Sequence, residues 1–131
     1  MEWREVYNVG IEPIDGQHKR LVHTITRLQT ALACGDINQE LANALRFLVD
    51  YAREHFAEEE RLMREIGFDG QERHRELHRK FAAQVTLLLV SLRQGKRVDP
   101  GALLDFLTDW VDRHIRCEDK KIGRWMTTKG S

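Results

Sequence analysis

The feature that most constrains the fold is a periodic face that runs through residues 37–66. Apolar and polar side chains recur on it at alternating intervals of four and three residues: Leu41, Leu45, Leu48, Ala52, His55, Glu59, Leu62 and Ile66. This spacing places all of them on one side of an α-helix. His55 and Glu59 therefore take positions within an apolar face. Because burying a polar side chain without a partner costs several kcal/mol, both need a partner in the core.

Three other segments combine an apolar face with inward histidines. These faces are His18 with Leu21, Val22, Ile25, Leu28 and Leu32; His74 and His78 with Phe81, Val85, Leu88 and Leu92; and His114 with Leu103, Leu107 and Trp110. Five of the six histidines thus share faces with core residues. His23 points about 140° away from His18, at roughly 100° per helical residue, and is interpreted as a surface histidine.

Helix start and stop signals divide the chain into an arm and four helices. Candidate capping residues are Asp15, Asp36, Asp69 and Asp99, the last followed by a proline at the first helical position. We expect an arm over residues 1–14 and helices over about 15–34, 37–66, 70–94 and 100–122. Short connections between long helices imply antiparallel neighbours. The sequence therefore predicts an all-α single domain over residues 1–131, an antiparallel up-down-up-down four-helix bundle with an N-terminal arm.

Composition excludes several classes of protein. The chain has 21 Lys and Arg against 21 Asp and Glu, so no basic excess favours nucleic acid. Its longest apolar run, Leu87–Val90, is too short for a transmembrane segment, and the N-terminus has no apolar run of a signal peptide. No apolar patch for self-association is evident. We expect a cytoplasmic monomer.

The two cysteines are expected to be free thiols. Cys34 lies sixteen residues beyond His18, about 24 Å along a helix, whereas Cys117 lies within one turn of His114. A disulfide needs Cα atoms within about 7 Å. Free thiols are consistent with a reducing compartment. A redox role for Cys117 is the alternative to its interpretation as a small buried hydrophobe.

The inward polar residues predict a metal site. His18, His55, Glu59, His74, His78 and His114 are residue types that bind metals, and a carboxylate after His114 makes a seventh. Seven ligands are too many for one ion and about right for two. Buried carboxylates also require a positive charge nearby, which a dinuclear site supplies.

The identity of the last carboxylate is open from spacing alone. On a straight helix Glu118, four residues after His114, faces the site and Asp119 turns away. Asp119 faces the site only if the helix contains one wide π-helical turn, a feature that favours functional sites. The later residues mildly favour the wide turn, because Ile122 and Met126 then face inward.

At these residues the chain closely resembles the hemerythrins, in particular the single-domain bacterial hemerythrins. The resemblance covers nearly the whole chain. It is carried by Asn8–Ile11, Ile14, Asp15, Gln17 and His18; by His55, Phe56, Glu59, Glu60, Met63, Phe68, His74 and His78; and by His114, Ile115 and Asp119. Phe68–Asp69 departs from the Tyr-Pro that bacterial members often have, at a position that provides no ligand.

The resemblance implies a di-iron cofactor and a ligand set. One iron would take His74, His78 and His114, and the other His18 and His55. Glu59 and Asp119 would bridge them, together with an oxo or hydroxo group. The resemblance thus favours Asp119 over Glu118. The iron held by His18 and His55 would keep an open position for dioxygen. Trp110, Phe56, Leu28, Ile115 and Leu62 are candidates to line a dry pocket there, with ordinary core packing as the equal alternative.

The function implied is reversible dioxygen binding without catalysis, as an oxygen carrier or store that delivers dioxygen to an oxygen-consuming enzyme. A site rich in neutral imidazole disfavours high-valent iron, whereas oxygen-activating di-iron bundles use more carboxylates. The main alternative is a sensor or regulatory module for oxygen, nitric oxide or redox state. An enzyme such as a peroxidase or nitric oxide reductase, and an iron-handling protein, are the remaining alternatives.

Overall fold

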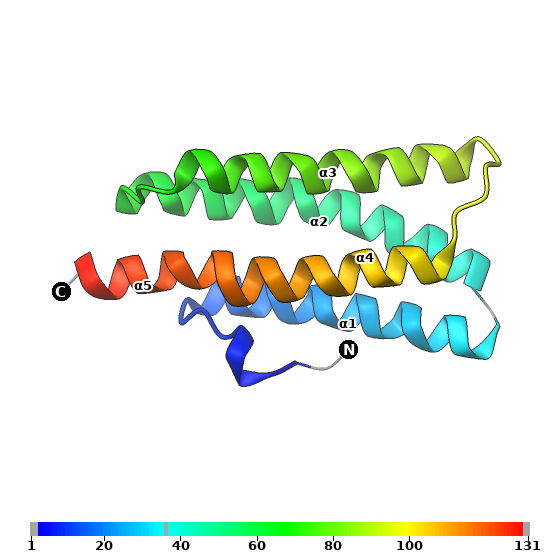
Figure 1. The fold of residues 1–131 in the computed structure, drawn as a ribbon, viewed down its shortest axis with the longest axis horizontal. Coiled ribbons are helices and arrows are strands. Elements are labelled where there is room, and N and C mark those ends of the chain that lie inside the picture. The colour runs from blue at the N-terminus through cyan, green and yellow to red at the C-terminus, as the bar shows by residue number, and fades with distance from the viewer. Residues whose placement is uncertain (1–2, 36, 130–131) are drawn as a thin grey trace.

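The computed structural model describes residues 3–35 and 37–129 and contains helices and no strand among them. The elements are η1 (Glu5–Tyr7), α1 (Glu12–Cys34), α2 (Ile37–Ile66), α3 (Gln71–Arg93), α4 (Pro100–Arg113), the π-helical η2 (His114–Asp119) and α5 (Lys120–Lys129). The last three follow one another without a break and form one long helical rod, so that α1, α2, α3 and the continuous α4–η2–α5 make the four rods of the bundle. Consecutive rods run in opposite directions (Figure 1), which confirms the antiparallel four-helix bundle.

The first helix begins at Glu12, so the expected start at Asp15 is wrong. Ile11 is the N-cap residue, and Pro13 lies in the first turn, where a missing N–H costs nothing. The Asp15 carboxylate instead accepts hydrogen bonds from the backbone N–H groups of Val9, at 2.7 Å, and Gly10, at 3.2 Å. It therefore attaches the arm to α1.

The other capping predictions have mixed outcomes. Asp99 caps α4, because its carboxylate accepts a hydrogen bond from Gly101 N at 3.0 Å. Asp69 does not cap α3. The N-cap residue is Gly70, so no side chain caps this helix. The buried Phe68 ring organises that turn, since a Cβ at Gly70 would lie 2.9 Å from it. Asp36 lies outside the described residues.

The fourth rod continues to Lys129, beyond the expected end near residue 122. Gly123, the residue after that expected end, lies inside α5 and is buried. A Cβ there would come 2.2 Å from the carbonyl oxygen of Val9. The glycine is therefore required by the close approach of the arm, and its conformation remains helical.

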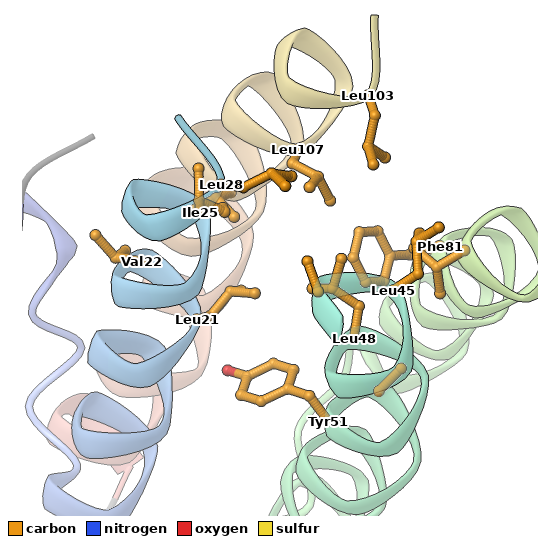
Figure 2. Close-up of a cluster of buried hydrophobic side chains, with 14 of the residues drawn as sticks. Leu21, Val22, Ile25, Leu28, Leu45, Leu48, Tyr51, Phe81, Leu103 and Leu107 are labelled. Carbon is orange, nitrogen blue, oxygen red and sulfur yellow. The ribbon is translucent and has the colours of Figure 1, made fainter. Parts of the chain in front are cut away.

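The apolar core lies mainly toward the α1–α2 connection. Leu21, Ile25 and Leu28 of α1 face Leu45 and Leu48 of α2, and Phe81, Leu103 and Leu107 complete the cluster (Figure 2). A smaller cluster of Met63, Phe68 and Ile122 lies toward the α2–α3 connection. The inward histidines and carboxylates lie between these two clusters, so apolar packing positions them from both sides.

Two further findings bear on the sequence predictions. None of the helices in the described part of the chain combines the length and apolarity needed to cross a bilayer.

Cys34 and Cys117 are both free, as expected. Both are exposed, however, so the interpretation of Cys117 as a buried hydrophobe is wrong. The π-helical turn directs Asp119 inward and leaves the neighbouring Cys117 facing outward.

Candidate metal centre

Seven polar side chains from all four rods meet in the middle of the bundle. They are His18 from α1, His55 and Glu59 from α2, His74 and His78 from α3, and His114 and Asp119 from η2. Each is at most 4% exposed. Regular helical spacing explains the convergence of the five histidines and Glu59, which lie on the inward faces of their helices, and the π-helical turn brings in Asp119.

The seven residues form two groups that share both carboxylates. His74, His78 and His114 lie with Glu59 and Asp119 in one group, and His18 and His55 lie with the same two carboxylates in the other. The ligand atoms of each group lie within 4.8 Å of one another. The groups thus differ in their number of histidines, three against two.

Each carboxylate divides its two oxygens between the groups. Glu59 Oε1 lies 2.5 Å from His74 Nε2 and 3.1 Å from His78 Nε2, whereas its Oε2 lies 3.2 Å from His55 Nε2. Asp119 Oδ1 lies 2.9 Å from His74 Nε2 and 3.1 Å from His114 Nε2. Its Oδ2 lies 2.9 Å from His18 Nε2. This is how carboxylates are arranged when they bridge two adjacent cations.

The π-helical turn decides between the two carboxylates that follow His114. Residues 114–119 form this wide turn, as the Asp119 alternative requires. Asp119 is completely buried among the histidines. Glu118 lies outside the cluster, 2.8 Å from Arg73 and 3.3 Å from Lys121. The structure therefore places Asp119, and not Glu118, with the other six residues.

Two residues that the sequence analysis named in the resemblance, without assigning them a role, orient the histidines. Gln17 Oε1 accepts a hydrogen bond from His55 Nδ1, and Glu60 Oε2 contacts His78 Nδ1 at 2.9 Å. A partner on Nδ1 leaves Nε2 free to bind a metal and fixes the orientation of the ring. Both residues adjoin a member of the cluster in sequence, Gln17 before His18 and Glu60 after Glu59. Their place in the resemblance and their position next to a ligand were the available signals.

The charges of the cluster are strongly coupled. Burial alone would lower the pKa of His74 and His114, but the neighbouring Asp119 and Glu59 raise these pKa values to about 9 and about 10. Burial acts to raise the pKa of both carboxylates, yet the surrounding histidines hold those pKa values below their ordinary ones. Burial lowers the pKa of His55. The two carboxylates are therefore anionic and require positive charge beside them.

Protons satisfy that requirement incompletely, and metal ions fit it better. His18 Nδ1 and Nε2, Glu59 Oε2 and both oxygens of Asp119 are buried and make no hydrogen bond within the described chain. His18 Nε2 lies 2.9 Å from Asp119 Oδ2 without hydrogen-bond geometry. Imidazole nitrogens and carboxylate oxygens that lie close together without hydrogen bonds between them are typical of a metal site. The mixed imidazole and carboxylate set suits a first-row transition metal.

A narrow cavity, with no room for a water-sized molecule in this structure, adjoins the two-histidine group. Its walls are His18, Leu21, Tyr51, His55, Phe56, Trp110, His114, Ile115 and Asp119. Three of the five expected pocket residues, Phe56, Trp110 and Ile115, lie in this wall. Aromatic stacking holds two of them, since Phe56 lies 3.8 Å from His78 and Trp110 lies 4.3 Å from His114 between ring centroids.

Leu28 and Leu62 do not line the cavity and instead pack as core residues, the alternative that the sequence left open. Leu28 lies ten residues beyond His18, about 15 Å along the helix, and packs in the main apolar core. Leu62 packs against the smaller cluster on the other side of the metal site. Leu21 and Tyr51 were missed, although each lies within one helical turn of a histidine in the two-histidine group. Burial raises the pKa of the Tyr51 hydroxyl well above its usual value, so it remains protonated.

A four-helix bundle with such a cluster in its core defines a class of helical metal-binding proteins. Residues 9–126 match the hemerythrin HHE cation binding domain. The bacteriohemerythrin of Pseudomonas aeruginosa (strain LESB58) is 36% identical over 117 residues, 89% of this chain and 75% of that protein. The myohemerythrin of Riftia pachyptila is 29% identical over 119 residues, 91% of this chain and 88% of that protein.

The fold agrees with these relationships. A wild-type hemerythrin crystal structure superposes with a TM-score of 0.87 at 26% identity, covering 97% of this chain and 98% of that one. The chain belongs to the hemerythrin family.

Proposed function

We propose that this protein binds dioxygen reversibly at a di-iron centre and serves as an oxygen carrier or store. The observation that carries the proposal is the division of the Glu59 and Asp119 oxygens between a three-histidine and a two-histidine group. Shared carboxylates favour two adjacent ions, and unequal histidine numbers make one ion more accessible than the other.

The residues on each side have different tasks. His74, His78 and His114, with the shared carboxylates, would hold one iron. His18 and His55, with the same carboxylates, would hold the other and leave one position for a small ligand. The two ferrous ions together would supply the electrons that dioxygen binding requires. Leu21, Phe56 and Ile115 form an apolar wall at that side, which keeps water away from the site.

Binding without turnover is part of the proposal. Five histidines, whose imidazoles are neutral when they bind metal, and only two carboxylates surround the site. This ratio disfavours the high-valent iron of oxygen-activating enzymes. The relatives named bacteriohemerythrin and myohemerythrin support assignment to the same general class. A sensor that uses the same centre is the competing role, and the experiment below separates it.

We also propose that the protein acts in the cytoplasm as a monomer that supplies an oxygen-consuming enzyme. Two exposed free thiols fit a reducing compartment. Large exposed apolar side chains in the described chain are limited to Leu32, Leu87 and Val90, a small area for self-association. Sedimentation of the iron-loaded protein tests the monomer, and a stable dimer would overturn it.

The visible absorption spectrum of the iron-loaded protein tests the proposed function. The protein is reduced without air, and spectra are recorded before air, after air and after argon purging. We expect a charge-transfer band that appears with air and fades under argon. A band that decays directly to a stable ferric spectrum would favour a sensor or an enzyme.

Matched histidine variants complete this test. His18→Ala removes a residue of the two-histidine group, whereas His23→Ala changes an exposed histidine of the same helix. We expect the reversible band to be lost in the first variant and retained in the second. Failure of the wild-type protein to retain iron would overturn the di-iron proposal.

A further inference from the structure

The Tyr51 hydroxyl is a buried donor without a hydrogen-bond acceptor in the described chain. The residue is 3% exposed. Its ring stacks on that of His55, with centroids 4.8 Å apart and planes 24° apart. A hydroxyl removed from water without a partner is energetically unfavourable, and a phenylalanine at this position would avoid that penalty. The hydroxyl therefore requires an explanation.

Its surroundings indicate where a partner would come from. Tyr51 lines the narrow cavity together with His18 and His55, the two histidines of the accessible side of the metal site. The tyrosine extends from α2 toward Leu21 of α1 (Figure 2), and Leu21 lines the same cavity. Phe56 and Ile115 make other parts of the wall apolar. Tyr51 thus carries the one hydroxyl in the wall of this cavity.

We propose that Tyr51 donates a hydrogen bond to the small ligand that occupies the accessible position beside His18 and His55. The inference rests on the proposed function in that dioxygen is the ligand expected there. Its chemical requirement is broader: the ligand must be small and must present an acceptor atom away from the metal. The hydrogen bond would slow release of the ligand and satisfy the buried hydroxyl. Stacking on His55 holds the phenol ring at that position.

The first experiment compares Tyr51→Phe with Tyr7→Phe. These are the two tyrosines of the chain. The Tyr7 hydroxyl donates a hydrogen bond to Asp112 Oδ1 at 3.2 Å, away from the cavity. Loss of a ligand hydrogen bond should raise the dioxygen dissociation rate and the azide dissociation constant about tenfold in Tyr51→Phe. Neither quantity should change more than about twofold in Tyr7→Phe. Equal values for Tyr51→Phe and the wild-type protein would overturn the proposal.

Thermal unfolding of the metal-free protein provides a readout that does not involve a loaded site. Because the Tyr51 hydroxyl has no partner in the protein, Tyr51→Phe should leave the unfolding midpoint unchanged or raise it. Tyr7→Phe loses a hydrogen bond and should lower it. A midpoint lowered in Tyr51→Phe as much as in Tyr7→Phe would assign the hydroxyl a structural partner and contradict the proposal.

Azide separates failure of this inference from failure of the proposed function. If the wild-type protein forms no reversible dioxygen complex but Tyr51→Phe weakens azide binding, the oxygen-carrier function fails and the Tyr51 hydrogen bond stands. If dioxygen binds reversibly and Tyr51→Phe changes neither ligand, the carrier function stands and the Tyr51 inference fails.

A second variant addresses the possibility that Tyr51→Phe folds poorly or loses metal. In the Tyr7→Phe background Tyr51 is the only tyrosine, so 3-fluorotyrosine can be incorporated at that position alone. Fluorination preserves the shape of the phenol and makes its hydroxyl a stronger donor. Ligand dissociation should therefore become slower than in Tyr7→Phe. Unchanged or faster dissociation would overturn the inference.

Discussion

The apolar core and the layer of five histidines with Glu59 and Asp119, here called the histidine layer, are formed by the same helices. In the core, Ile25, Leu45 and Leu48 are buried against one another and need nothing from outside the chain. In the histidine layer, Glu59 and Asp119 are equally buried, yet the described chain leaves several of their oxygens without hydrogen bonds. Burial in the apolar core is therefore favourable without any partner from outside the chain. Burial in the histidine layer leaves carboxylate oxygens that need positive charge beside them.

The largest effect should come from removing a carboxylate that both groups share. We expect Glu59→Ala to abolish binding of both ions, whereas His78→Ala should mainly affect the three-histidine group. Metal content per chain after loading measures the difference. Glu65→Ala is the matched control, because Glu65 lies on the same helix with its side chain 61% exposed. Retention of one ion by Glu59→Ala would show that Glu59 serves a single site.

A core substitution should act without regard to metal. Leu48 is fully buried, and Leu48→Ala should lower the free energy of unfolding by about 2–5 kcal/mol in metal-free and loaded protein alike. Leu87→Ala, at a 60% exposed position, should change it by less than about 0.5 kcal/mol. Urea unfolding with and without metal measures both. A Leu48→Ala effect confined to loaded protein would break the proposed independence of the two regions.

Removing an orienting residue should have a smaller effect on the metal site than removing a ligand. Glu60 contacts His78 Nδ1 at 2.9 Å, and Glu60→Ala should weaken metal binding about 10–100-fold. Competition with a chelator measures the change, again with Glu65→Ala as the control. The same affinity in Glu60→Ala and the control would mean that packing against Phe56 suffices to orient His78.

A further prediction is a pH dependence that distinguishes the two regions. In metal-free protein the pKa values of His74 and His114 rise from the ordinary 6.5 to about 9 and about 10. Their contribution to stability is complete below the ordinary pKa and is lost as pH rises through the raised values. Metal-free protein should therefore be less stable at pH about 10.5 than at pH about 7.

Loaded protein should lack this alkaline loss, because metal binding deprotonates the histidines and releases protons near neutral pH. Urea unfolding at both pH values, and proton release during metal titration, measure the two forms. An alkaline loss of equal size with and without metal would assign it to groups outside the histidine layer.

Most of the bundle and of the candidate site could be predicted from the sequence, because both depend on which positions of each helix face inward. Periodicity records which positions face inward, and this identifies His55 and Glu59 as readily as Leu48. The choice between Glu118 and Asp119 depends on one additional backbone turn, which spacing allows and does not require. The resemblance to the hemerythrins favoured Asp119, and the observed π-helical turn agrees with that choice.

The features that sequence analysis missed depend on contacts between separate segments. The hydrogen bond from His55 to Gln17 and the position of Tyr51 in the cavity wall arise only when α1 lies against α2. Gly123 follows the expected helix end, where glycine is common, whereas its actual role comes from the arm that crosses it. Local rules cannot identify such partners, because the relevant neighbour is distant in sequence.

The crossing of the arm over Gly123 also bears on the order in which the chain is assembled during synthesis. Val9 leaves the ribosome early, but the helix surface that it covers contains a residue made more than one hundred positions later. Folding during synthesis proceeds from the N-terminus, and contacts so far apart in sequence form late. The arm must therefore wait for α5, and its docking completes a fold whose central helices are already paired.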